Sequence, residues 1–271
     1  MELMCEVLGV SKSGYFDWCK RADSPKEARS NELVVKIERI HEGSRKTYGS
    51  PRVYRTLKAM GEKCSKTTVE RLMREQGIRS KMRRKFKATT DSNHRLPVAP
   101  NVVKRDFTAK SPNRLWCTDI TYLRTDEGWL YLAAIIDVFT RKIVGWAMRD
   151  RLTLPLALGA LEMAVEAQRP RKGLVHHSDR GCQYAARDYQ KALEDYGMVA
   201  SMSRRGQCWD NAMMESFFHT LKTEHVYHER FSTKAQAKSS VFEWIEVFYN
   251  RQRIHSALGF VSPECYERMA A

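Results

Sequence analysis

The sequence lacks what a disulfide framework, a zinc knuckle or a membrane anchor requires. It contains seven cysteines in 271 residues and no Cys-x-x-Cys pair, a pattern typical of reduced thiols inside a cell. The longest apolar run, residues 130–136, is far shorter than the roughly 20 residues of a membrane-spanning helix. The first residues lack the basic and apolar segments of a signal peptide. We therefore expect a cytoplasmic protein with no membrane partner.

Motifs for several common chemistries are also missing. The sequence has no Gly-x-Ser-x-Gly, no Walker loop and no His-Glu-x-x-His, which are the motifs of α/β-hydrolases, nucleoside triphosphatases and zinc proteases. A hydrophobic content of 42% with 10% aromatic residues excludes wholesale disorder. The length allows a large core and two domains. The function must therefore be sought in other residue patterns of a folded protein.

Positive charge is concentrated in the first part of the chain. The net charge is +15; residues 1–110 carry 26 Lys+Arg against 13 Asp+Glu, and residues 111–271 carry 21 against 19. A basic first part beside a nearly neutral second part indicates separate tasks, the first being attraction to a phosphate backbone. Charge alone leaves DNA, RNA and anionic lipid open as partners.

Two short capped helices are predicted in the basic part. Ser50 and Pro51 offer an N-cap and a first helical residue. Thr67 and Glu70 form a capping box for the second helix. The apolar residues of the inner faces are Val53, Leu57, Met60, Val69, Leu72 and Met73, and the helices end at Gly61 and Gly77. Such a helix pair around a tight turn is typical of a helix-turn-helix.

The second helix would present polar side chains to DNA. The residues that point away from its predicted core, where a recognition helix contacts the groove, are Lys66, Thr68, Arg71 and Arg74. Helix pairs with basic faces also occur in proteins that never contact DNA. The predicted domains are a small helical copy of the pattern at residues 1–25, a helix-turn-helix DNA-binding domain at 26–87 with a basic run at 81–87, and a linker at 88–110.

From residue 111 the pattern changes to strands and helices. Strands are predicted at residues 115–124, 129–138, 142–148, 174–177 and 198–202, and helices at 154–168, at 187–196, from about 211 with Asp210 as its cap, and at 234–251. The first three strands would form an antiparallel meander. We therefore expect an α/β fold, a mixed sheet with helices on its faces, over residues 111–271.

Three acidic residues of this part stand out by position. Asp119 lies inside the first strand, where aspartate is disfavoured unless it has a partner or a task. Asp179 follows the fourth strand, at the strand end where α/β sheets tend to bind ligands. Glu215 lies one turn into the helix that begins near residue 211. Each alone fits a structural role, but together they offer the carboxylate oxygens that Mg²⁺ or Mn²⁺ prefers. A pair of such ions can promote in-line displacement at phosphorus.

Sequence blocks around these acids resemble a known family. The blocks are Trp-x-Thr-Asp-Ile-Thr-Tyr at 116–122, His-Ser-Asp-Arg-Gly-x-Gln-Tyr at 177–184 and Asp-Asn-Ala-x-x-Glu-Ser-Phe-Phe at 210–218, with 35 residues between Asp179 and Glu215. With these blocks, the chain resembles the DDE transposases of bacterial insertion sequences, in particular the second-frame product of the group with two overlapping reading frames, related to retroviral integrases. The resemblance runs from about Leu8 to the C-terminus. It implies a ribonuclease-H-like mixed sheet core behind an N-terminal all-α helix-turn-helix region.

The resemblance also implies an activity. The chain would be a transposase that nicks DNA 3′ ends and transfers strands by in-line phosphoryl transfer. Asp119, Asp179 and Glu215 would be both its catalytic residues and the ligands of two Mg²⁺ or Mn²⁺ ions. Its implied partners are the terminal inverted repeats, target DNA, an upstream-frame product or fusion, and further copies of itself in a synaptic complex at the bacterial nucleoid.

Further residues are expected around these acids. The resemblance implies that Lys222, two helical turns after Glu215, contacts DNA, although an ordinary exposed lysine also fits this spacing. Arg204 and Arg205 lie in a loop similar to the mobile loop of integrases, which equally suits a plain surface turn. Asp137 is interpreted as a structural hydrogen-bonding residue. The neighbouring histidines His176 and His177 either order the metal ligands or pack at the strand end.

Two other functions remain open from the sequence. One is a DNA-binding regulator with an inactive core, which the intact set of three acids disfavours. The other is a ribonuclease-H-like nuclease, which the basic first part and the 35-residue spacing disfavour.

Overall fold

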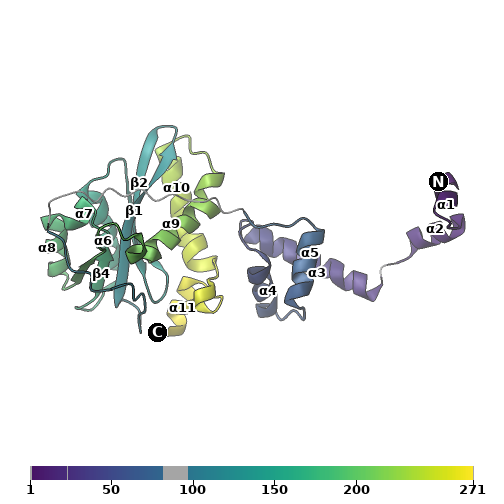
Figure 1. Ribbon diagram of the computed structural model, residues 1–271, viewed down its shortest axis with the longest axis horizontal. Coiled ribbons are helices and arrows are strands. Elements are labelled where there is room, and N and C mark those ends of the chain that lie inside the picture. The colour runs from purple at the N-terminus through teal and green to yellow at the C-terminus, as the bar shows by residue number, and fades with distance from the viewer. Residues whose placement is uncertain (1, 23, 82–96, 271) are drawn as a thin grey trace. The chain divides into compact units, whose positions relative to one another are not determined.

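A computed structural model describes residues 2–22, 24–81 and 97–270 of the chain (Figure 1). The chain divides into two compact units, Met1–Ser80 and Lys81–Ala271. The predicted basic run falls outside the described residues except for Lys81, as do residues 88–96 of the predicted linker. In the described part of the chain, no helix combines the length and apolar character needed to cross a bilayer.

The first unit is entirely helical. Its helices are α1 (Glu2–Val7), α2 (Lys12–Lys20), α3 (Pro25–Gly43), α4 (Ser50–Ala59) and α5 (Lys66–Glu75). Ser24 and Glu27 form a capping box at the start of α3. Helices α3, α4 and α5 contact one another pairwise around buried apolar side chains, which are Leu33, Ile37, Val53, Leu57, Val69, Leu72 and Met73. The predicted pair of short helices is therefore present, packed on a longer helix.

The ends of this helix pair differ in detail from the prediction. Gly49, and not Ser50, is the N-cap of α4, because Ser50 already has helical conformation. The N-cap of α5 is Ser65, whose hydroxyl accepts a hydrogen bond from the Thr68 amide at 3.1 Å; the predicted capping box at Thr67 was wrong by two residues. Met60 is 56% exposed, since it is the residue at which the chain leaves α4.

The second unit is built on a five-stranded mixed sheet. The strands are β1 (Leu115–Thr125), β2 (Gly128–Asp137), β3 (Ile143–Arg149), β4 (Val175–Ser178) and β5 (Val199–Met202), in the order β3-β2-β1-β4-β5. The first three strands pair antiparallel, while β4 pairs parallel with both β1 and β5. This arrangement confirms the predicted meander and mixed sheet of a ribonuclease-H-like fold.

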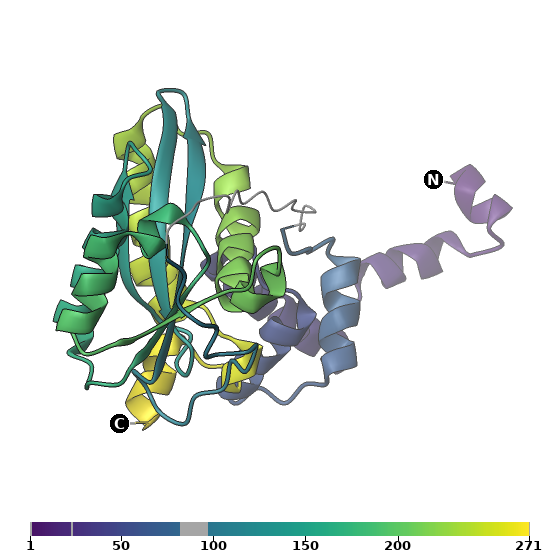
Figure 2. The same cartoon turned by 60° about the vertical axis from the view of Figure 1, so that its left-hand side comes forward.

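Helices cover both faces of the sheet (Figures 1 and 2). One core holds α6 (Leu154–Gln168), α7 (Cys182–Ala185) and α8 (Arg187–Asp195) against the sheet. The other holds α9 (Ala212–Glu224), α10 (Lys234–Glu243) and the π-helix η3 (Trp244–Gln252), with α11 (Pro263–Ala270) against η3. Short 3-10 turns are η1 (Cys208–Asn211), η2 (Val226–His228) and η4 (Ser256–Leu258).

A glycine lets α6 approach the sheet closely. A Cβ built on Gly145 of β3 would lie only 2.3 Å from the Ala160 carbonyl oxygen of α6. Any side chain at this position would therefore push the helix away from the sheet. The close packing holds α6 against β3 and β2. In the sheet, β2 lies next to β1, the strand that carries Asp119.

Two segments of the second unit correct the predictions. Residues 97–110, assigned to the linker, make contacts with the sheet domain: the Val102 amide donates to Ser201 Oγ at 3.0 Å and Val103 is buried. The last predicted helix begins at Lys234 as expected but continues as a π-helix from Trp244.

Candidate active site

Asp119 and Asp179 lie on neighbouring strands at equivalent positions. In the parallel pairing of β1 with β4, Cys117 is opposite His177. Asp119 and Asp179 each follow two residues later, so the same register places them next to each other at the carboxyl end of β4. Both acids are partly exposed. The sheet thus brings together two carboxylates that are 60 positions apart in the chain.

Each of these aspartates is oriented by the backbone that follows it. Asp119 Oδ1 accepts a hydrogen bond from the Ile120 amide, and Asp179 Oδ1 accepts one from the Gly181 amide, both at 2.8 Å. A Cβ at Gly181 would lie 3.0 Å from Asp179 Oδ1, so a larger residue would disturb this turn. The two carboxylates are therefore held in defined orientations.

Glu215 approaches the aspartates from α9. At the start of this helix, Asn211 Nδ2 donates to the Thr118 carbonyl oxygen of β1 at 3.1 Å, next to Asp119. Glu215 is four residues further along and hence on the same helix face. Its place in the first turn also favours its negative charge. The prediction that Asp210 caps α9 was wrong, because the N-cap is Asn211 and Asp210 makes other contacts.

The three acids influence one another electrostatically. Burial raises the pKa of Asp119 well above its usual range, and the charges of Asp179 and Glu215 raise it further. Burial also raises the pKa of Glu215. A place where negative charges crowd in a poorly solvated environment favours a cation. Asp179 and Glu215 therefore both lie within electrostatic range of Asp119.

The chemistry of the donor set fits a hard divalent ion. Carboxylate oxygens from a strand, a strand end and a helix match the ligands that Mg²⁺ and Mn²⁺ prefer, and the mutual repulsion at Asp119 would be relieved by such a charge. Among the described residues, no group of three or more His, Cys, Asp or Glu side chains lies close enough together to hold a metal ion as the side chains are arranged here. The fit therefore rests on donor type and charge.

Lys222 is buried, which corrects the alternative of an ordinary exposed lysine. Only 5% of the residue is exposed, and its Nζ lies 4.9 Å from the centre of the Tyr122 ring. Burial lowers the pKa of Lys222, while the charge of Asp119 raises it in part. Because Lys222 follows Glu215 by two turns on the same face of α9, its ammonium group lies on the side of the three acids.

A buried tyrosine of α7, which was not predicted as a site residue from the sequence, adjoins the aspartates. Tyr184 OH lies 3.2 Å from Thr118 Oγ1, which in turn donates to the Ala134 carbonyl oxygen. Burial raises the pKa of Tyr184, and the charges of Asp119 and Asp179 add to this effect. Tyr184 stands last in the block at 177–184, so its position in the motif was the available signal.

Asp210 is the second residue whose role the sequence did not reveal. It is fully buried, and its carboxylate accepts hydrogen bonds from Arg204 at 2.9 Å and from Arg105 at 2.6 Å. Asn101 donates to the same group. These partners, Arg204 above all, hold the pKa of Asp210 well below its usual range. Asp210 thus fastens the segment around residues 101–105 and the loop before α9 beside the site.

Three other residues singled out in the sequence of the second unit, Asp137, His176 and His177, make structural contacts. Asp137 is buried and accepts from the Asn113 and Thr140 amides, in agreement with a structural role. His176 Nε2 contacts Tyr189 OH at 3.2 Å, and His177 Nε2 contacts the Asp210 carbonyl oxygen at 2.7 Å. These contacts favour packing at the strand end over the alternative of ordering the acids.

Apart from the buried Lys222, the predicted DNA-binding side chains lie wholly or partly at the surface of their units. Arg204 and Arg205 are exposed in the loop between β5 and η1, although Arg204 is also paired with Asp210. On α5, Lys66, Arg71 and Arg74 are exposed and Thr68 is partly exposed. Two of these cations pair along the helix, Lys66 with Glu70 at 3.6 Å and Arg71 with Glu75 at 2.8 Å.

Family models match most of the chain. An HTH-like domain matches residues 28–86, and two integrase core domain models match residues 109–208 and 196–263. The matches therefore cover the helix pair of the first unit and all three acids of the second.

Curated relatives align along nearly the full length. An uncharacterized 31 kDa protein of insertion element IS600 from Shigella sonnei is 48% identical over 99% of this chain and 100% of its own length. The transposase InsF for insertion sequence IS3A of Escherichia coli strain K12 is 42% identical over 98% of this chain and 93% of its own length. Among solved structures, a chain of the simian T-cell lymphotropic virus intasome, in complex with the PP2A regulatory subunit B56 gamma, superposes with a TM-score of 0.50. It has 12% identity over 85% of this chain and 74% of that one, which supports the fold alone.

Proposed function

The chain belongs to the transposases of bacterial insertion sequences that carry an integrase core domain, and we propose that Asp119, Asp179 and Glu215 are its catalytic residues. The observation that carries this proposal is the pairing of β1 with β4, in which Asp119 and Asp179 follow directly opposed residues, together with the Asn211 contact that holds the start of α9 next to Asp119. The charges of Asp179 and Glu215 also contribute to the raised pKa of Asp119. Three acids from β1, the end of β4 and α9 thus share one electrostatic environment. Other acids of the unit, such as Asp137 and Asp210, are instead engaged in structural hydrogen bonds.

The three carboxylates would hold two Mg²⁺ or Mn²⁺ ions. When bound, such ions supply charge stabilisation for the attacking and leaving oxygens of an in-line displacement at phosphorus. The residues of the chain contribute orientation, because Asp119 and Asp179 are each fixed by a backbone amide. The Asn211 contact with β1 holds the start of α9 beside them.

The proposed reaction has two displacements. In the first, water attacks the phosphodiester at the end of the element and a 3′-hydroxyl leaves. In the second, this 3′-hydroxyl attacks a phosphodiester of the target, and the target's own 3′-oxygen leaves. The buried ammonium group of Lys222, whose pKa is raised in part by the charge of Asp119, would bind a phosphate oxygen beside that residue. Arg205 and the exposed edge of Arg204 would position the strand.

DNA end recognition is assigned to the first unit. Its helix pair matches an HTH-like domain, and the outer face of α5 presents Lys66, Thr68, Arg71 and Arg74. These side chains would contact the terminal inverted repeats, and the second unit would act on the ends and the target. A homo-oligomeric synaptic complex, an upstream-frame product or fusion, and a cytoplasmic location at the nucleoid complete the proposal.

Replacing each acid by its amide tests the catalytic assignment. We expect Asp119→Asn, Asp179→Asn and Glu215→Gln each to reduce strand transfer by at least about 100-fold, since several kcal/mol of transition-state stabilisation are involved. Binding of terminal-repeat DNA should stay close to wild type. The assay is Mg²⁺- or Mn²⁺-dependent joining of a labelled end to target DNA, and Asp188→Asn, an exposed acid of α8, is the matched control.

Two results would overturn the assignment. Normal strand transfer by any of the three amide variants would remove that residue from the catalytic set. Cleavage of RNA–DNA hybrids by the wild type, without any joining of DNA, would identify a nuclease instead.

A further inference from the structure

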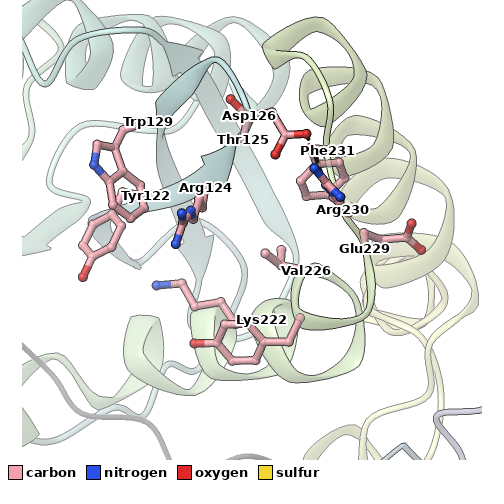
Figure 3. A pocket seen from close by; sticks show the side chains of 11 residues that line it. Tyr122, Arg124, Thr125, Asp126, Trp129, Lys222, Val226, Glu229, Arg230 and Phe231 are labelled. Carbon is pink, nitrogen blue, oxygen red and sulfur yellow. Dashed lines mark hydrogen bonds and ion pairs between the residues drawn. The ribbon is translucent and has the colours of Figure 1, made fainter.

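A cavity of about 700 Å³ lies next to Lys222 in the second unit. Figure 3 shows Tyr122 and Trp129 on one side of it and Arg230 and Phe231 on the other, with Arg124 and Lys222 between them. The volume lies within the range of small-ligand sites, about 300–1,000 Å³. None of the roles assigned above uses this cavity as a whole.

One wall of the cavity consists of two exposed aromatic rings. Tyr122 is 44% exposed and Trp129 is 49% exposed. Their ring centres are 5.0 Å apart, and the rings stand at 82° to each other. Tyr122 belongs to β1 and Trp129 to β2, where Trp129 is opposite Arg124. The sheet therefore holds two large aromatic side chains at the cavity, and each is partly exposed.

Positive charge accompanies the aromatic wall. Arg124 is exposed and makes no ion pair with any residue in the described part of the chain. Lys222 Nζ lies over the Tyr122 ring at 4.9 Å from its centre. On the far side Arg230 pairs with Asp126 at 3.2 Å. Cations next to exposed aromatic faces match a ligand that has both a phosphate and a planar ring.

Lys222 connects the cavity with the three acids. Its ammonium group lines the cavity and lies within electrostatic range of Asp119. A phosphodiester held at the acids would therefore continue directly into the cavity. Carboxylates on the opposite side, Asp126 and Glu229, are acceptors that could bind the amino groups of a base.

We propose that this cavity binds one unpaired nucleotide of the DNA strand adjacent to the reacting phosphodiester. The base contacts the Tyr122 and Trp129 rings, and its phosphate binds Lys222 and Arg124. The nucleotide is unpaired because a base within a duplex has both faces covered by its neighbours, whereas an extruded base offers a face for stacking. The proposal rests on the DNA-joining function proposed above and adds a place for the strand beside the scissile bond.

Binding of matched oligonucleotides tests the proposal without any chemistry. A labelled oligothymidylate and a strand of the same length that carries abasic sites have equal charge but differ in bases. In a chelator, the full-length protein should bind the first more tightly. Trp129→Ala and Tyr122→Ala should each weaken binding of oligothymidylate by about 10-fold, in the range of base–aromatic stacking, and leave binding of the abasic strand nearly unchanged.

Two further variants sharpen this experiment. Trp129→Phe keeps an aromatic face and should retain most of the preference for bases. Phe242→Ala removes another aromatic that is 49% exposed, one that contacts Trp146 of β3 and is not part of the cavity; it should behave as wild type. Circular dichroism of each variant verifies the fold. Unchanged base preference in both folded alanine variants would overturn the proposal.

Photochemical crosslinking gives an independent test of the location. A strand with 5-iodouracil as its unpaired base should crosslink to the peptide that contains Tyr122 or Trp129. The crosslink should be lost in Tyr122→Ala and Trp129→Ala and should remain in the control variant Phe242→Ala. Crosslinks confined to other peptides would contradict the proposal. The binding and crosslinking measurements are both made in a chelator, without any strand transfer. A negative result in them would therefore leave the catalytic assignment intact, since strand transfer by Asp119→Asn tests that assignment separately.

Discussion

Asp119 holds a negative charge that its surroundings oppose. Burial and the neighbouring charges of Asp179 and Glu215 raise its pKa well above the usual range, and only Lys222 and the Ile120 amide act in the opposite direction. An acid with a raised pKa in the folded state contributes stability while it is protonated, and this contribution is lost as the pH rises through that pKa. Ionisation of Asp119 therefore costs stability in the metal-free protein.

Removing this charge should stabilise the metal-free protein. We expect Asp119→Asn to raise the Tm in a chelator, by about 2–4 °C for each kcal/mol gained in a unit of this size. Mg²⁺ or Mn²⁺ should raise the Tm of the wild type and have little effect on the variant, because ligand binding to the folded state stabilises it. Thermal unfolding with and without metal measures both. A lower Tm of the variant in a chelator would contradict the electrostatic interpretation.

The buried His176 should make the second unit less stable at acidic pH. Burial lowers the pKa of this histidine from 6.5 to about 3, and its ring contacts Tyr189 OH. A base with a lowered pKa stabilises the fold above the unfolded pKa, and the stability is lost as the pH falls. Between pH 6.5 and pH 5 the loss should be about 1.6 kcal/mol, because the slope approaches about 1.4 kcal/mol per pH unit only below the unfolded pKa.

Urea unfolding at several pH values measures this loss. His176→Gln should flatten the decrease in the free energy of unfolding between pH 6.5 and pH 5, although the variant is less stable at pH 7. His228→Gln, at an exposed histidine, is the matched change. An equal slope in wild type and His176→Gln would assign the acid sensitivity to another group.

At the scale of secondary structure, α9 is fastened at both ends. Its start is held to β1 by Asn211. Its last residue, Glu224, forms a buried pair of hydrogen bonds, both 2.7 Å, with Arg253, which directly follows η3. The two side chains are 8% and 4% exposed. The orientation of Glu215 and Lys222 on this helix therefore depends in part on the Glu224–Arg253 pair, which lies outside the three sequence blocks.

Removing one member of this buried pair should be costly. Arg253→Met removes the buried cation that donates two hydrogen bonds to Glu224, and we expect a loss of about 3–5 kcal/mol in the free energy of unfolding. The double variant Glu224→Leu with Arg253→Met should lose clearly less than the sum of the two single variants. Chemical denaturation of the four proteins gives the coupling energy. Additive losses would show that the pair contributes nothing specific.

The elements of the second unit were largely predictable because their signals are local. Apolar alternation and turn residues gave the five strands, and α6 was predicted at Leu154–Gln168, as the structure has it. Contacts between distant segments had no such signal. The burial of Asp210 depends on Arg105, more than 100 positions away, and the change to a π-helix at Trp244 depends on packing.

In the candidate site, too, local signals were predictable from the sequence and contacts between distant segments were not. Asp119, Asp179 and Glu215 were predicted from strand position, spacing and family blocks. The burial of Lys222 against Tyr122 was not, because it requires the side chain of α9 to meet a residue of β1. Helix spacing specifies which face a residue occupies, but not which strand residue lies opposite that face.

At the scale of the whole molecule, the proposal assigns recognition and chemistry to different units of the chain. The unit Met1–Ser80 carries 17 Lys+Arg against 11 Asp+Glu, a net charge of +6. Residues 81–110, which belong to the other unit, carry 9 against 2, and residues 111–271 carry 21 against 19. Attraction to a phosphate backbone releases counterions, so it depends steeply on salt. If the first unit supplies recognition, most of the salt dependence of end binding should come from its cations.

Titrations at different salt concentrations test this division. Replacing Arg71 and Arg74 of α5 by Gln should lower the slope of log K against log salt by about 2, since each phosphate contact contributes about 0.9. The same variant should bind terminal-repeat DNA more weakly at every salt concentration. Glu215→Gln and the exposed-lysine control Lys191→Gln of α8 should keep the wild-type slope. A slope that falls equally in Lys191→Gln would show that both units share the phosphate contacts, and the proposed separation would be wrong.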